Sequence, residues 1–124
     1  MDASINVLGG LLVPCSHEPR TGWFRDGCCN TDEQDVGSHT VCCQLTWDFL
    51  EYIQAQGNDL ISPAPQYGFP GLQAGDKWCV CAGSWRQAFR AGIACPVYLE
   101  STHAKALQIV PLEELMTQAV GMEA

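Results

Sequence analysis

Residues 21–43 read TGWFRDGCCNTDEQDVGSHTVCC, and this stretch decides how the rest of the chain is interpreted. It holds four of the eight cysteines and one of the three histidines in a segment with little helical character. The run from His39 to Leu45 has β-propensity and predicts a short strand. A second cysteine pair lies in KWCVC at residues 77–81, and we expect it to face the first stretch across the fold.

Strand geometry limits which of these cysteines can act together. Neighbouring side chains on a strand point to opposite faces, so only one of Cys28 and Cys29 can face a common site, and likewise only one of Cys42 and Cys43. In residues 77–82 the alternation predicts that Cys79 and Cys81 share one face. We expect both sulfurs to point towards residues 26–43.

Hydrophobic periodicity and capping signals predict the other elements. Thr46 is a candidate N-cap for a helix over 46–56, which Gly57 would end. Ser84 and Gln87 have the form of a capping box and predict a second helix that stops at Gly92. The remaining expectations are one or two short strands within 5–13, a loop over 57–76, strands at 77–82, 96–100 and 108–110, a single helical turn at 103–107 and a last helix over 111–120.

This order predicts an α+β domain in which helices pack on one face of a small mixed sheet. At 124 residues we expect one domain spanning 1–124, large enough to bury a core of its own. No repeat and no phosphate-binding glycine motif is visible. Trp23 and Phe24 are interpreted as aromatic anchors that hold a loop on this core.

Charge and hydropathy exclude several classes of function. The formal net charge is -8, and no cluster of lysine or arginine offsets it, so we expect no nucleic-acid partner and no anionic membrane surface. No apolar run approaches the roughly 20 residues of a membrane span. An acid and two glycines interrupt the first 15 residues, so we read no export signal there and expect a cytoplasmic protein. The sequence does not indicate which small molecule or protein is the partner.

Eight cysteines are many for a reducing compartment, where disulfides rarely persist. Soft thiolates together with one imidazole suit zinc in tetrahedral geometry. However, the chain contains no C-x-x-C pair, which is the strong signal of a zinc module. Buried structural thiols are the alternative, and the residues alone favour them over a bound metal. The candidate metal ligands, not all of which can bind at once, are Cys28, Cys29, His39, Cys42, Cys79 and Cys81.

A catalytic interpretation requires one activated thiolate. Arg25 lies three residues before Cys28 and could favour its thiolate, or that of Cys29. His39 could then act as a base that Asp35 or Asp26 orients. The alternative for His39 is a hydrogen-bonded residue at a strand edge. For Asp59, which follows the first predicted helix, a turn-closing role is the alternative to ligand binding.

Several motifs together resemble a known family. The runs are NVLGGLLVPCS, TGWFRDGCCNT, DVGSHTVC, GNDL, FPGL-x-x-GD-x-WC-x-C and THAKAL-x-x-VPLEEL, which together span roughly residues 6–115. They are similar to an uncharacterised bacterial family, domain of unknown function 2237. The resemblance implies a single-domain two-layer sandwich and implies no activity. Positions that match its pattern are Cys15, Arg25, Asp26, Cys28, Cys29, Asp35, His39, Cys42, Asn58, Asp59, Trp78, Cys79, Cys81 and His103.

The resemblance also sets Cys43 and Cys95 aside as local additions, and it favours a shared polar site around Cys28, Cys29, His39 and Cys79. Our hypothesis from the sequence is therefore a cysteine/histidine site that binds a metal, with zinc the candidate, or that performs thiol redox chemistry. The alternatives are an enzyme with a cysteine nucleophile and a structural or partner-binding module with buried thiols.

Overall fold

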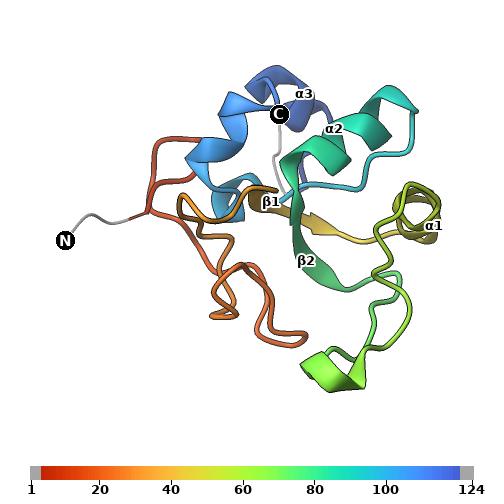
Figure 1. Cartoon of the computed structure of the whole chain (residues 1–124). Coiled ribbons are helices and arrows are strands. Elements are labelled where there is room, and N and C mark those ends of the chain that lie inside the picture. The colour runs from red at the N-terminus through yellow and green to blue at the C-terminus, as the bar shows by residue number, and fades with distance from the viewer. Residues whose placement is uncertain (1–3, 121–124) are drawn as a thin grey trace.

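The computed structural model describes residues 4–120, and its centre is one pair of antiparallel strands (Figure 1). Strand β1 spans His39–Gln44 and strand β2 spans Lys77–Cys81. Cys42 lies opposite Cys79, and Val41 lies opposite Val80, with one irregularity in the register between His39 and Val41. Both cysteine-containing stretches are thus strands, and they pair with each other.

The alternation of side chains divides this sheet into two differently packed faces. On one face Val41, Cys43, Trp78 and Val80 belong to the main hydrophobic core. On the other face Cys42 and Cys79 form a separate buried cluster with Cys15 and Cys29, against which Tyr98 packs. The expectation that adjacent cysteines separate is confirmed, because Cys42 lies in the small cluster and Cys43 in the main core.

Helices supply much of the main core. Helix α2 contacts both strands and helix α1. Phe49 and Leu50 of α1 and Trp85 of α2 are fully buried in this core. The helical elements are α1 at Trp47–Ala55, α2 at Ala82–Arg90 and α3 at Leu112–Thr117, with 3-10 turns η1 at Pro65–Tyr67, η2 at Leu99–Ser101 and η3 at Ala104–Gln108.

The first predicted helix is confirmed, whereas the start of the second was misplaced. The Thr46 hydroxyl accepts a hydrogen bond of 3.1 Å from the amide of Phe49, and Gly57 follows the helix at a φ of +100°. Helix α2 begins at Ala82, so the expected capping box at Ser84 lies inside it and Cys81 is the residue at its N-cap. The reason is that β2 passes directly into α2 without an intervening turn.

The sheet is smaller than expected, because the predicted mixed sheet is reduced to two antiparallel strands within the described part of the chain. Val97 makes only isolated bridges, an antiparallel one to Cys43 and a parallel one to Ala119, and residues 108–110 form no strand. The Thr102 hydroxyl accepts the hydrogen bond of the Cys42 amide at 3.2 Å. At this amide a side chain replaces the backbone acceptor of a ladder, whereas the Cys42 carbonyl accepts the amide of Tyr98 at 2.9 Å, so the backbone contacts along this edge stay isolated.

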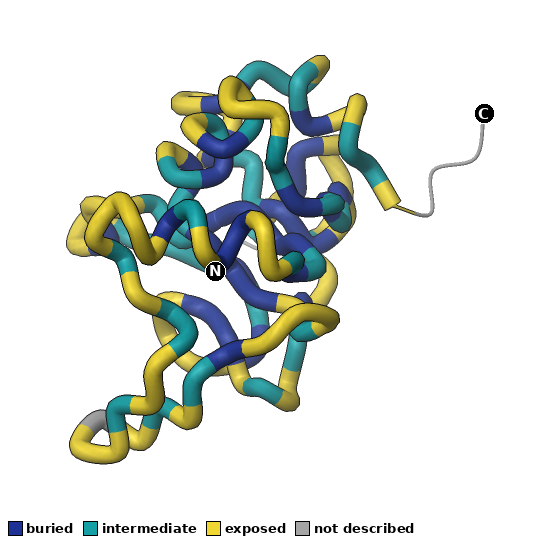
Figure 2. The backbone as a smooth tube through the Cα atoms, turned by 90° about the vertical axis from the view of Figure 1, so that its right-hand side faces the viewer, coloured by how far each residue is buried: buried dark blue, intermediate teal, exposed yellow. Residues whose placement is uncertain are grey.

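Residues 4–38 contain no strand or helix, so the strands expected within 5–13 are wrong. The segment makes single bridges instead, among them Ile5 to Leu11 and Asn6 to His103. Figure 2 shows exposed loops around a buried centre. In Figure 1 the tip of the 57–76 loop, which carries η1, lies away from the strand pair. Among the described residues, no helix is long and apolar enough to cross a membrane.

Candidate functional site

A thiol, an imidazole and a carboxylate lie in line at one end of the strand pair. The Sγ atom of Cys81 lies 3.4 Å from Nε2 of His39, and Nδ1 of His39 lies 2.6 Å from Oδ1 of Asp35. The register explains the first contact, since His39 opens β1 and is paired with Cys81, which ends β2. The expectation that Cys81 points towards the 26–43 stretch is confirmed.

Asp35 is fixed by the loop that leads into β1. Its Oδ2 atom accepts hydrogen bonds from the Thr31 hydroxyl at 2.8 Å and from the backbone amide of His39 at 2.9 Å. Burial acts to raise the pKa of this carboxyl, but the hydrogen bonds from His39 and Thr31 outweigh burial, and the pKa is lowered. Asp35 is therefore a buried carboxylate held ready to orient an imidazole.

His39 is held in a position that favours its charged form. Its pKa is raised to about 9, first by the hydrogen bond with Cys81, against the opposing effect of burial, and also by Asp35. The side chain is about one-third exposed, at 34%, and Trp23 stacks on its ring with 5.8 Å between ring centroids. Trp23 is itself 38% exposed and Phe24 49%, so the expected role of both as core anchors is wrong. Trp23 instead covers the imidazole.

Cys81 and His39 open into a pocket of about 590 Å³. Its wall includes Arg25, whose guanidinium lies 5.1 Å from the centre of the Trp78 ring and donates a hydrogen bond of 2.7 Å to the Gly22 carbonyl. Arg25 has a φ of 55°, in the left-handed region that few non-glycine residues adopt. The lining residues are Trp23, Arg25, His39, Asn58, Asp59, Leu60, Ala64, Phe69, Trp78, Cys79, Val80 and Cys81.

Asp59 lines this pocket and also closes a turn. Its Oδ1 atom accepts hydrogen bonds from the amides of Ile61 at 2.9 Å and Ser62 at 3.0 Å. The hydrogen bonds around Ser62 contribute most to lowering the pKa of this exposed carboxyl. The turn-closing interpretation is therefore confirmed.

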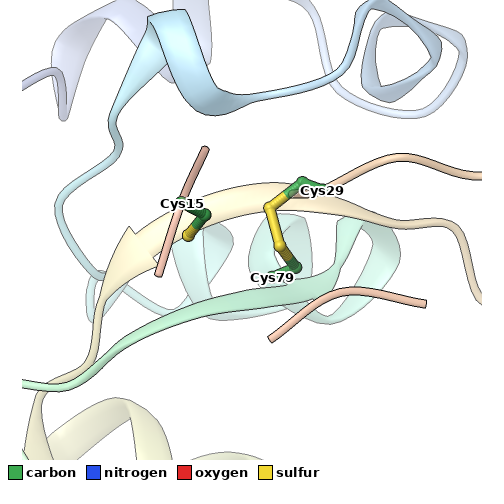
Figure 3. A group of neighbouring side chains, drawn as sticks. All are labelled: Cys15, Cys29 and Cys79. Atoms are coloured by element: carbon green, nitrogen blue, oxygen red, sulfur yellow. A yellow bond between two sulfur atoms is a disulfide. The ribbon is translucent and has the colours of Figure 1, made fainter. Parts of the chain in front are cut away.

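Two disulfides take up four of the remaining cysteines. Cys15 is bonded to Cys42, and Cys29 to Cys79, with Cα atoms 5.8 Å and 5.3 Å apart. Figure 3 shows Cys15 beside the Cys29–Cys79 bond, between the strands and the N-terminal loops. Four cysteines are free, of which Cys43 and Cys95 are buried and Cys28 and Cys81 are partly exposed.

The structure brings together only some of the residues that the sequence suggested for the site. It brings His39, Asp35 and Cys81 together and places Arg25 on the same pocket wall. Cys28 does not line this pocket, and burial, followed by the nearby charge of Asp26, raises the pKa of its thiol. Among the described residues, the candidates Cys29, Cys42 and Cys79 are all found in disulfides rather than beside the imidazole.

Sequence reasoning treated Cys81 only as a candidate metal ligand and missed it as the thiol next to His39. The Cys-x-Cys alternation correctly predicted the face of β2 on which Cys81 lies, but it gave no register of β2 against β1. Cys15 was also missed as a disulfide partner, since it lies in a loop whose path no local pattern fixes.

The chain was compared with known proteins. Residues 5–119 match the model of a family described as an uncharacterized protein conserved in bacteria, DUF2237. The match confirms the resemblance found in the motifs and covers the strands, the helices and both disulfides. No curated protein matches the chain.

Proposed function

Since the chain belongs to the DUF2237 family of uncharacterised bacterial proteins, we propose its function from geometry: it carries out thiol chemistry with Cys81 as the nucleophile. The observation that carries this proposal is the line of Cys81, His39 and Asp35 at the mouth of a pocket, with contacts of 3.4 Å and 2.6 Å. A cysteine next to a base that a third group orients is the arrangement of an activated nucleophile.

Each residue has a distinct role in this proposal. His39 takes the thiol proton at Nε2, and the resulting imidazolium stabilises the thiolate of Cys81. The Asp35 carboxylate accepts a hydrogen bond from the Nδ1–H group of His39 and so fixes both the tautomer and the ring orientation. The thiolate then attacks an electrophilic atom of a molecule bound in the pocket, and the imidazolium can return its proton to the leaving group.

The pocket wall supports a small ligand with a flat apolar part and an anionic group. Trp23, Phe69 and Trp78 provide aromatic surface, and the volume lies within the range of small-molecule sites. The guanidinium of Arg25 forms no ion pair with any described carboxylate, so it is free to bind a carboxylate or phosphate of the ligand.

Thiol redox chemistry is a second candidate, and one observation favours it. Cys79 lines the same pocket as Cys81 and is bonded to Cys29, so a buried disulfide begins two residues from the free thiol on the same strand. In this version the Cys81 thiolate exchanges with a disulfide instead of attacking carbon.

Alkylation followed by mass spectrometry tests the proposal. With limiting iodoacetamide at neutral pH, we expect Cys81 to be modified at least about tenfold faster than Cys28, because its thiolate has an imidazolium partner. Cys28→Ser should leave the fast phase unchanged, and Cys81→Ser should remove it. Fast modification of Cys28, or equal rates at both sites, would contradict the proposal. A Cys79–Cys81 disulfide that forms without added oxidant, with release of Cys29 as a free thiol, would favour the redox version.

A further inference from the structure

The sulfurs of the two disulfides form a single buried group. Figure 3 shows Cys15, Cys29 and Cys79, whose Sγ atoms all lie within 4.8 Å of one another. The sulfur of Cys42 is bonded to that of Cys15. At most 6% of the surface of any of these residues is exposed. Four sulfurs from distant parts of the chain thus share one small volume closed to water.

The strand register creates half of this group. Cys42 and Cys79 are direct partners across the antiparallel pair and point to the same face. Side chains at such positions have Cβ atoms about 4.5–5.5 Å apart. Cys15 and Cys29 come from loops and cover this face, each forming a disulfide with one strand cysteine.

We propose that reduction of both disulfides turns Cys15, Cys29, Cys42 and Cys79 into the four ligands of one zinc ion. Each disulfide takes two electrons and two protons from a dithiol, which leaves as its own disulfide, so two equivalents of dithiol give four thiols. Zinc then displaces up to four thiol protons, and four S–Zn bonds replace two S–S bonds.

The geometry fits zinc with small side-chain shifts. Four sulfurs at about 2.3 Å from a central ion lie about 3.8 Å from one another. The sulfurs of Cys15, Cys29 and Cys79 now lie within 4.8 Å of one another, and the sulfur of Cys42 is bonded to that of Cys15, so once the disulfides open, rotation about the cysteine side chains can bring the four together. Four soft ligands and no opening to water define a closed, structural type of site.

A zinc ion at this site would hold the N-terminal loops on the two strands. Residues 4–38 have no strand or helix, and their covalent attachments to the sheet are the two disulfides. In a reducing compartment these attachments would open. A zinc ion on the same four sulfurs would attach the loops at Cys15 and Cys29 to β1 and β2 again, so the fold persists in either redox state.

This proposal is independent of the one for Cys81, whose thiol lies outside the group. The imidazole of His39 and the thiol of Cys81 offer the competing metal ligands, with one nitrogen and one sulfur. A metal spectrum distinguishes these two sites, because only the disulfide cysteines provide four sulfurs.

The experiment starts from the full chain reduced with a phosphine, which is removed before metal is added without oxygen. We expect one equivalent of Co²⁺ to give the intense visible bands of a tetrahedral tetrathiolate complex. Zinc should displace the cobalt, and X-ray absorption should show four sulfurs at about 2.3 Å. The non-reduced protein should bind neither ion at this site. No binding by the reduced protein, or a site with nitrogen ligands, would overturn the proposal.

Serine variants identify the ligands. Cys15→Ser and Cys79→Ser should each weaken cobalt binding by more than the 10–100-fold that loss of an outer-shell partner costs. Cys28→Ser, Cys81→Ser and Cys43→Ser are matched controls and should keep the wild-type spectrum. If a ligand variant fails to fold, the sulfur count of the wild-type complex still decides the question. Loss of the cobalt bands in Cys81→Ser would contradict the assignment.

Discussion

Cys79 and Cys81 lie two residues apart on one strand and on the same face, yet they differ in environment. Cys79 is buried, bonded to Cys29 and covered by the N-terminal loops. Cys81 lies where β2 meets α2, is free, and faces His39 in a pocket. A strand end admits water and a polar partner, whereas the middle of the pair is closed on both faces. Position along the strand therefore decides that Cys79 is a buried disulfide cysteine and that Cys81 is a free thiol beside an imidazole.

The largest expected difference between the two is in stability. Without reductant, Cys79→Ser should lower the free energy of unfolding by about 2–4 kcal/mol, because it opens a disulfide that closes a long loop of the unfolded chain. Cys81→Ser should change it by less than about 1 kcal/mol, since this thiol is partly exposed and unbonded. Denaturant unfolding followed by tryptophan fluorescence measures both. Equal losses of unfolding free energy in the two variants would contradict the structural difference between Cys79 and Cys81.

The next effect concerns the carboxylate behind the imidazole. Asp35→Asn should slow alkylation of Cys81 by about tenfold, because the amide orients His39 less well and no longer carries a charge. It should also destabilise the fold by about 1.5–3 kcal/mol, since it weakens buried hydrogen bonds to a charged group. Glu33→Gln, in the same loop but exposed, is the control and should leave the alkylation rate of Cys81 unchanged.

A pH series tests the charge on His39. Its pKa in the folded protein, about 9, exceeds the ordinary value of about 6.5, so its stabilising contribution is complete below pH 6.5 and is lost as the pH rises through about 9. The stability difference between wild type and His39→Gln should therefore shrink over this range. The pKa of His103 is lowered instead, first by burial, so His103→Gln should not reproduce this trend.

The same titration can be followed by NMR in Cys81→Ser. Because the hydrogen bond with Cys81 is the first cause of the raised value, the pKa of His39 should fall towards its ordinary range in this variant. A pKa that stays near 9 would assign the shift to Asp35 alone and would weaken the case for a thiolate at Cys81.

The smallest expected effect is steric. A Cβ atom at position 37 would lie 3.1 Å from the sulfur of Cys81. Gly37→Ala should therefore displace the thiol by a few tenths of an ångström and slow its alkylation a few-fold, with a stability change below about 1 kcal/mol. Gly83→Ala meets no atom within 4 Å and provides the control. An unchanged alkylation rate would show that this thiol tolerates displacement.

Local patterns predicted the parts of the fold that depend on neighbouring residues. The capped helix after Thr46 and the alternation in residues 77–81 are both confirmed, because capping and pleating act over only a few residues. The strands expected at 96–100 and 108–110 failed because their partners were non-local. In place of the expected ladder, the structure has a hydrogen bond from the Cys42 amide to the Thr102 hydroxyl and isolated bridges at Val97. No local sequence pattern predicts these contacts.

The candidate site could likewise be predicted from the sequence only in part. The sequence by itself determined that Cys79 and Cys81 share a face, that adjacent cysteines separate, and that His39 and Asp35 were worth testing. Only the tertiary structure decided that Cys81 rather than Cys28 meets the imidazole, and that Cys15 joins the buried sulfurs. The physical reason is that strand register and loop path are set by packing between residues far apart in the chain. Side-chain alternation, in contrast, is already fixed by the backbone of a single strand.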